Sequence, residues 1–112
     1  MRKLVVLASS VAILASVSFA KEVKVGVVMP MSGPLAAYGQ TCNEGVEFAN
    51  TLQPTLKNGD TIKLVLVDNK GDKVETATAT TRLISSDKVV GIIGALTSTN
   101  TAQVMAITDK KQ

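Results

Sequence analysis

Hydrophobic residues follow two alternating patterns along the chain. Three short, almost unbroken apolar runs cover residues 23–29, 62–67 and 89–93. Runs of this kind are typical of strands buried on both faces of a parallel sheet. After each run, apolar or small residues recur every three or four positions, which is the spacing of one helix face. The three predicted faces are Cys42, Val46, Ala49 and Leu52; Val74, Ala77, Thr81 and Ile84; and Ala102, Met105 and Ala106.

Turn-forming and capping residues separate these segments. Pro30 ends the first run, and the pattern predicts a first helix from about Gln40 to the residues before Pro54. Asp72 is followed three residues later by an acidic residue, the spacing of a capping box, which predicts a second helix reaching about Ser86. The order β-α-β-α-β-α predicts an α/β fold, an open parallel sheet with helices on both faces. We expect the flavodoxin-like strand order 2-1-3.

Residues 1–20 have the pattern of a secretory signal peptide. A basic start precedes an apolar run over residues 4–14, and Ser18 and Ala20 form a small-residue cleavage site before Lys21. The alternative is a membrane anchor, but the apolar run is shorter than the roughly 20 residues that a membrane-spanning helix needs. We therefore expect an exported chain whose mature part is residues 21–112.

Charge and composition narrow the function classes. Two of the 12 basic residues lie in the first 20 positions, so the rest of the chain has ten basic residues against nine acidic ones. This balance, with 3% aromatic residues and no Trp, argues against nucleic-acid binding. With no His, the chain offers neither an ordinary zinc site nor a Cys–His nucleophile, and Cys42 is expected to be a small buried residue. We expect no metal and no cofactor.

A nucleotide-binding enzyme is the alternative that the strand order leaves open. Asp68, directly after the second run, stands where a doubly wound enzyme has the acidic residue that holds a ribose. However, the loop at 30–34 reads Pro-Met-Ser-Gly-Pro and lacks the G-x-G-x-x-G motif. The sequence therefore disfavours an enzyme.

Two loops follow carboxyl ends of predicted strands, where open α/β sheets bind ligands. They cover residues 30–39 and 94–101. The second loop places hydroxyl groups at a helix start, where free amides and the helix dipole favour a carboxylate or a phosphate. On spacing alone, however, the pattern favours Ser98 and Thr99 acting only as an N-cap. Tyr38 in the first loop would either form a wall for a ligand or pack over the helix start.

These residues also carry a family resemblance. Residues 24–39, reading KVGVVMPMSGPLAAYG, resemble the opening of the periplasmic leucine/isoleucine/valine-binding proteins. The strand that ends at Asp68 and the segment Ile92–Ser98 are similar to this family in order and spacing. The family has the type I periplasmic-binding-protein fold and provides the substrate-binding subunits of ABC transporters for branched-chain amino acids.

The resemblance implies a site, a partner and a location. Ser98 would bind the α-carboxylate of a branched-chain amino acid or a similar small ligand. Leu96 and Thr97 would line the pocket beside it, and Tyr38 would wall the apolar side chain. The protein would act in the periplasm without catalysis and deliver its ligand to a membrane permease of the ABC type.

We expect residues 21–112 to be the truncated first part of lobe 1 of a two-lobed protein. The apolar run at 89–93 would otherwise be an exposed sheet edge, which invites pairing with another chain. The family's second lobe supplies an acidic residue for the ligand's ammonium group. Two alternatives stay open, namely a sensory ligand-binding domain of the same fold and a non-functional truncated gene product.

Overall fold

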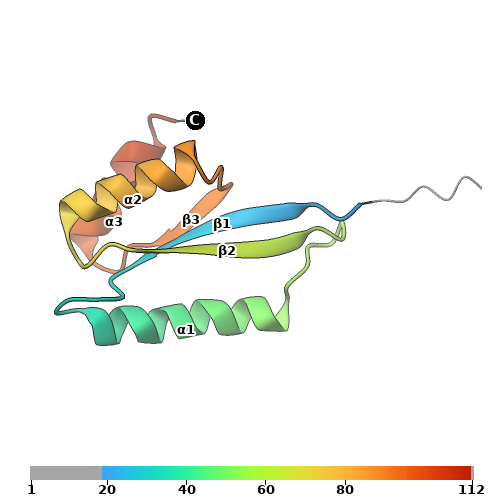
Figure 1. The fold of residues 1–112 in the computed structure, drawn as a ribbon, viewed down its shortest axis with the longest axis horizontal. Coiled ribbons are helices and arrows are strands. Elements are labelled where there is room, and N and C mark those ends of the chain that lie inside the picture. Colours follow the sequence, from blue (N-terminus) through green and yellow to red (C-terminus); the bar gives the residue numbers. More distant parts are fainter. Residues whose placement is uncertain (1–18, 112) are drawn as a thin grey trace, which may run out of the picture.

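The computed structural model describes residues 19–111, in which three strands alternate with three helices (Figure 1). The predicted signal peptide lies almost wholly outside the described residues. No helix within the described part is both long and apolar enough to cross a membrane. In chain order the elements are β1 (Glu22–Met29), α1 (Ala36–Leu52), β2 (Thr61–Asp68), α2 (Lys73–Ser85), β3 (Gly91–Gly94) and α3 (Ser98–Thr108).

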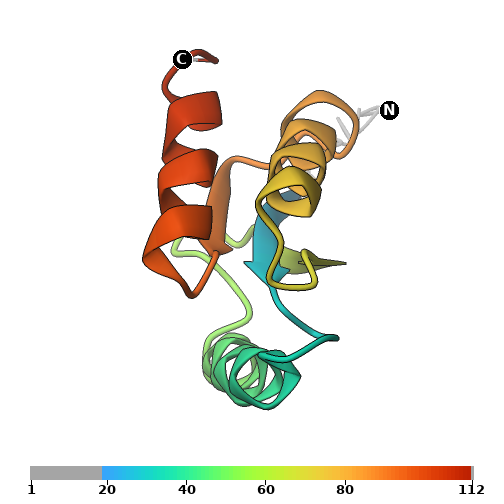
Figure 2. The same ribbon diagram turned by 90° about the vertical axis from the view of Figure 1, so that its left-hand side faces the viewer.

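The three strands form one parallel sheet in the order β2-β1-β3, which confirms the predicted fold class. Crossovers between parallel strands are right-handed. Two crossovers that run in opposite directions across the sheet therefore place their helices on opposite faces of it. The step from β1 to β2 puts α1 on one face. The return step to β3 puts α2 on the other face, and α3 lies beside α2 (Figures 1 and 2).

The apolar core lies between the sheet and the two helices α2 and α3. Val28 in the central strand is fully buried against a cluster contributed by these helices and the turn after β3. Leu83 of α2 packs over Gly26, where an added Cβ would lie 2.8 Å from the Leu83 Cδ1 atom. The remaining members of the cluster are Ala79, Ala95 and Val104.

The buried faces of α2 and α3 differ from the predicted ones. Val74 is 73% exposed and Met105 is 57% exposed. The buried positions of α2 are instead Thr76, Ala79, Thr80 and Leu83, and those of α3 are Asn100 and Val104. Threonine can be buried on α2 because its hydroxyl donates to the carbonyl four residues earlier, which satisfies the polar group. The Thr80 hydroxyl donates in this way to the Thr76 carbonyl at 2.7 Å.

Helix α1 begins at Ala36, four residues before the predicted start, and packs closely on the loop before it. At Gly39 an added Cβ would collide with the carbonyl of Pro30. Farther along, the helix stands away from the sheet, and a cavity of about 490 Å³ separates the two. Cys42 lies at this cavity and is exposed, so the prediction of a buried cysteine was wrong.

Strand β3 is shorter than the apolar run that predicted it. Pairing with β1 covers only Gly91–Gly94, where Val25 stands opposite Gly91 and Val28 opposite Gly94. Val90, inside the predicted strand, is exposed and precedes the ladder. Apolar character alone therefore located this strand but placed its start two residues too early.

We predict opposite stability effects for two glycines of α1. Gly39→Ala should lower the free energy of unfolding by about 2 kcal/mol, because its methyl group would push the helix away from Pro30. Gly45→Ala should raise it by about 0.5–1 kcal/mol, because alanine favours helix and an added Cβ meets nothing within 4 Å. Urea unfolding followed by circular dichroism measures both. Equal effects of the two variants would contradict the close approach at Gly39.

Candidate functional site

The carboxyl ends of the strands bring the two predicted site loops to one edge of the sheet (Figures 1 and 2). In the sheet register Met29 of β1 stands opposite Asp68 of β2, and Val28 stands opposite Gly94 of β3. The loops that lead to α1, α2 and α3 therefore leave the sheet within one residue of the same position along the strands. The central strand β1 sets the position of both site loops.

The loop after β1 is held by the carboxylate of Asp68 at the end of β2. Oδ1 accepts hydrogen bonds from the amides of Met31 at 2.9 Å and Ser32 at 3.3 Å. Oδ2 accepts from the Ser32 hydroxyl at 2.5 Å. Oδ1 also accepts from the Lys70 amide at 2.7 Å, which tightens the turn after β2. Because this protein's own groups occupy both oxygens, the structure does not support the ribose-holding role.

These bonds keep Asp68 ionised. Burial raises the pKa of the Asp68 carboxyl, but the hydrogen bond from the Ser32 hydroxyl and those from the backbone amides of Lys70, Met31 and Ser32 lower it. The net pKa lies below the ordinary value of 3.8, because together the four donors outweigh desolvation. Asp68 is thus a charged acceptor whose donors come from two loops.

The same loop is fixed from its other side by α1. The Gln40 side chain donates from Nε2 to the Met31 carbonyl at 3.1 Å, so both backbone polar groups of Met31 are bound. Tyr38 lies two residues before Gln40 in the first turn of α1 and is 67% exposed. Of the two interpretations of Tyr38, packing over the helix start is therefore not supported.

The turn after β3 presents the remaining predicted residues. Thr97 is the N-cap of α3, and its hydroxyl accepts from the Asn100 amide at 3.4 Å. The alternative in which Ser98 and Thr99 serve only as N-caps is therefore wrong, because Ser98 is the first helical residue. Leu96 has a φ of 75° and is 39% exposed.

Glycine is required where this turn begins. Gly94 has a φ of 138°, a conformation that residues with a side chain rarely adopt. An added Cβ would also collide with the Val28 carbonyl. The amide of Ala95, the next residue, donates to the Thr101 hydroxyl at 3.1 Å. The start of α3 is thus held to the end of β1 by a close backbone approach.

Ser98 combines two properties suited to an anion. Its side chain is exposed, and Thr97 already caps the start of the helix, so the Ser98 hydroxyl is not needed as a cap. The amides of Ser98 and Thr99 in the first turn have no acceptor within the helix and, with the helix dipole, favour a carboxylate in front of them. No three His, Cys, Asp or Glu side chains within residues 19–111 gather as a metal site.

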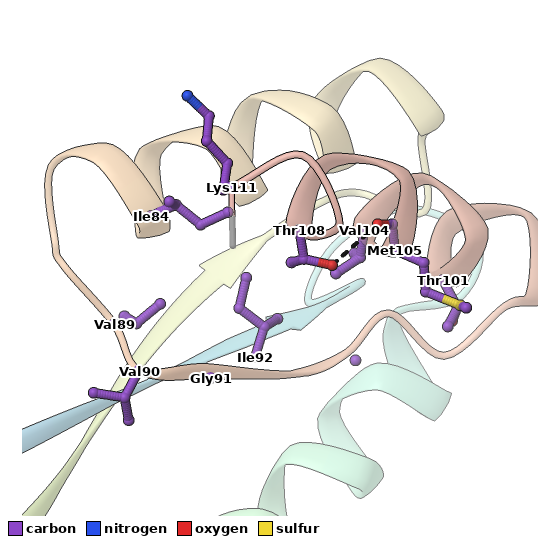
Figure 3. A pocket seen from close by; sticks show the side chains of 11 residues that line it. Ile84, Val89, Val90, Gly91, Ile92, Thr101, Val104, Met105, Thr108 and Lys111 are labelled. Carbon is purple, nitrogen blue, oxygen red and sulfur yellow. Dashed lines mark hydrogen bonds between the residues drawn. The ribbon is translucent and has the colours of Figure 1, made fainter.

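Two cavities border the sheet, and neither is lined by the predicted site residues. Figure 3 shows a cavity of about 440 Å³ between β3, α2 and α3, with Ile92, Val104 and Met105 in its wall. Its wall and that of the cavity beneath α1 do not include Tyr38, Leu96, Thr97 or Ser98. Tyr38 lies at the start of α1 on one face of the sheet, and Ser98 lies at the start of α3 on the other. The end of β1 lies between these two helix starts (Figures 1 and 2).

Comparisons with known proteins agree on one family. The sequence model of a family described as "Periplasmic binding protein" matches residues 22–112. A Leu/Ile/Val-binding protein of Citrobacter freundii is 34% identical over 90 residues, covering 79% of this chain and 24% of that protein. The chain spans about a quarter of the length of the curated relatives it matches.

Solved structures extend this agreement to the fold. The leucine-binding protein LivK of Thermotoga maritima matches with a TM-score of 0.76 and 35% identity, over 79% of this chain and 25% of that one. A second match is LivJ of Streptococcus pneumoniae, a branched-chain amino acid transporter substrate-binding protein solved in complex with isoleucine. Its TM-score is 0.73 at 33% identity, over 80% of this chain and 26% of that one.

We predict that the cap and its neighbour differ in their contribution to stability. Thr97→Ala should lower the free energy of unfolding by about 1 kcal/mol, because the Asn100 amide loses its acceptor. Ser98→Ala should change it by less than about 0.5 kcal/mol, because an exposed first-turn hydroxyl is not needed for the helix. Thermal or urea unfolding of the two variants measures this difference. A larger loss for Ser98→Ala would contradict the assignment of Thr97 as the cap.

Proposed function

Because the chain belongs to the periplasmic-binding-protein family, we propose that it is part of an exported substrate-binding protein of an ABC transporter. Its ligand is a branched-chain amino acid or a similar small amino acid or amide. The observation that carries this proposal is the exposed Ser98 hydroxyl in the first turn of α3. It lies beside free amides, and it is not needed as a cap because Thr97 caps the helix. The relatives named for leucine, isoleucine and valine support the ligand class.

The carboxylate of the ligand binds at the start of α3. The Ser98 hydroxyl donates to one carboxylate oxygen, and the first-turn amides favour the negative charge. Such a bond is stronger than one between neutral groups because its acceptor is ionised. Leu96 and Thr97 lie immediately before Ser98 and line the pocket beside the carboxylate.

The apolar side chain of the ligand lies against Tyr38. The exposed ring at the start of α1 offers an apolar surface to an aliphatic group, and ligand sites combine a few polar groups with such walls. Binding is the whole task of the site: it holds the ligand for a membrane permease and performs no reaction. The ligand's ammonium group is bound by residues other than these four site residues.

We also propose that residues 21–112 are the first part of lobe 1 and that the protein is exported to the periplasm by residues 1–20. Three observations support the first statement: the coverage of a quarter of the relatives, the cavity beside β3 and the gap between α1 and the sheet. Further chain would cover these surfaces. Closure of two lobes around the ligand would then present both to the permease.

We predict that Ser98→Ala weakens binding of leucine in the full-length secreted protein by about 10- to 100-fold, the loss of one hydrogen bond to a charged group. Isothermal titration calorimetry measures the dissociation constant. Ser85→Ala is the matched control, because Ser85 is an exposed serine in the last turn of α2, away from the site edge. Unchanged affinity in Ser98→Ala would remove Ser98 from the site.

We predict a mature product that begins at Lys21 and is several times longer than 92 residues. Intact mass spectrometry of a periplasmic extract, with sequencing of the N-terminus, measures both properties. A mature product that ends at Gln112 would contradict the two-lobed interpretation. Retention of residues 1–20 in the mature product would contradict the signal peptide.

A further inference from the structure

We infer that Asp68, acting with Ser32, is a positioning residue that sets the place of the Tyr38 wall and thereby selects among ligand side chains. This inference rests on the proposed function, in which Ser98 binds the carboxylate and Tyr38 walls the side chain. Asp68 itself contacts no ligand, because its two oxygens are occupied by this protein's own donors.

The first step is the connection between two loops far apart in sequence. Asp68 binds Met31 and Ser32, which lie 37 and 36 positions earlier in the chain. Met31 is bound in turn by Gln40 in the first turns of α1. A continuous series of hydrogen bonds therefore runs from the end of β2 through the first loop to the helix turn that carries Tyr38.

The second step is the direct contact between these loops. At Gly33, which has a φ of 80°, an added Cβ would lie 3.1 Å from the Lys70 carbonyl oxygen. At Gly71, an added Cβ would lie 3.6 Å from the Leu35 Cδ1 atom. The first loop thus packs directly against the turn that follows Asp68. Because packed groups shift together, loss of the Asp68 bonds displaces the start of α1.

The third step is the independence of the carboxylate side. The start of α3 is held by the Thr97 cap and by the close approach of Gly94 to Val28. None of these contacts involves Asp68 or Ser32. Loss of the Asp68 bonds should therefore move the side-chain wall while the carboxylate contact at Ser98 stays in place.

The test compares leucine with alanine as ligands of the full-length secreted protein. The two share a carboxylate and differ in the side chain that Tyr38 would contact. Calorimetric titration gives a dissociation constant for each, and their ratio is the leucine preference. Asp68→Ala should lower this preference by about tenfold, the effect of losing buried contact to about two methylene groups. The affinity for alanine should change little.

Two milder variants give graded results. Ser32→Ala removes only the bond to Oδ2 and should lower the preference in the same direction by a smaller factor. Because Ser32 is exposed, this variant also decides the question if Asp68→Ala does not fold. Asp68→Asn should restore part of the preference, because the amide oxygen can still accept from the Met31 and Ser32 amides.

Asp72→Ala is the matched control in the same loop. Asp72 also accepts from backbone amides, those of Val74 at 2.8 Å and Glu75 at 2.9 Å, but these bonds cap α2 and do not reach the first loop. This variant should lower the melting temperature and leave the leucine preference unchanged. The same loss of preference in Asp72→Ala would show a general loss of stability and overturn the inference.

Two further outcomes separate this inference from the proposed function. If the wild-type protein binds leucine and Asp68→Ala keeps the preference, the positioning role is overturned and the proposed function stands. If the wild-type protein binds neither amino acid, the proposed function fails and the inference fails with it.

Discussion

The hydrogen bonds of the Asp68 carboxylate are the interaction on which the site edge depends. A parallel sheet places the ends of its strands side by side, but it does not fix the loops that leave them. Here one half-buried negative charge at the end of β2 binds the loop after β1 and also the turn that follows β2. Hydrogen bonds to an ionised acceptor are stronger than those between neutral groups, so a single side chain can hold two loops. The start of α1 is placed by this arrangement.

The two faces of the sheet are packed to different degrees. On the face of α2 and α3, Leu83 and Val104 close an apolar core against the centre of the sheet. On the other face, α1 is tight at Gly39 and then leaves a gap of about 490 Å³ above Val25 and Leu64. The glycine allows close approach only at the end that leads into the site. Packing is therefore tightest where the site loop is held.

The two sides of the proposed site offer different interactions to a ligand. On the Ser98 side, a capped helix start offers a hydroxyl and free amides to a negative charge. On the Tyr38 side, an exposed aromatic ring offers an apolar surface. The two residues lie on different helices, and β1, which pairs with β2 and with β3, lies between the two helix starts. An amino acid has a charged end and an apolar end, and this division of the surface suits such a ligand.

Local patterns in the sequence were sufficient for the order of elements and for some of their ends. Runs of apolar residues located the strands, and Asp72 marked the start of α2, where its side chain accepts from Val74 and Glu75 as predicted. The handedness of crossovers then indicated helices on the faces of the sheet, and the analogy with flavodoxin-like sheets gave the strand order. The strands, the helices and their caps depend on residues a few positions apart. For that reason a single sequence can predict them.

Other features required the tertiary structure. Val74 and Leu83 lie on two faces of α2 that have the same helical periodicity. Only the packing of Leu83 over Gly26 decides which of the two faces is buried. Cys42 is exposed because α1 stands away from the sheet beyond its first turns. Thr97, and not Ser98, caps α3 because the turn through Gly94 fixes where the helix begins. The sequence by itself determined the elements and their order, whereas contacts between residues far apart in the chain decided which side chains are free to bind a ligand.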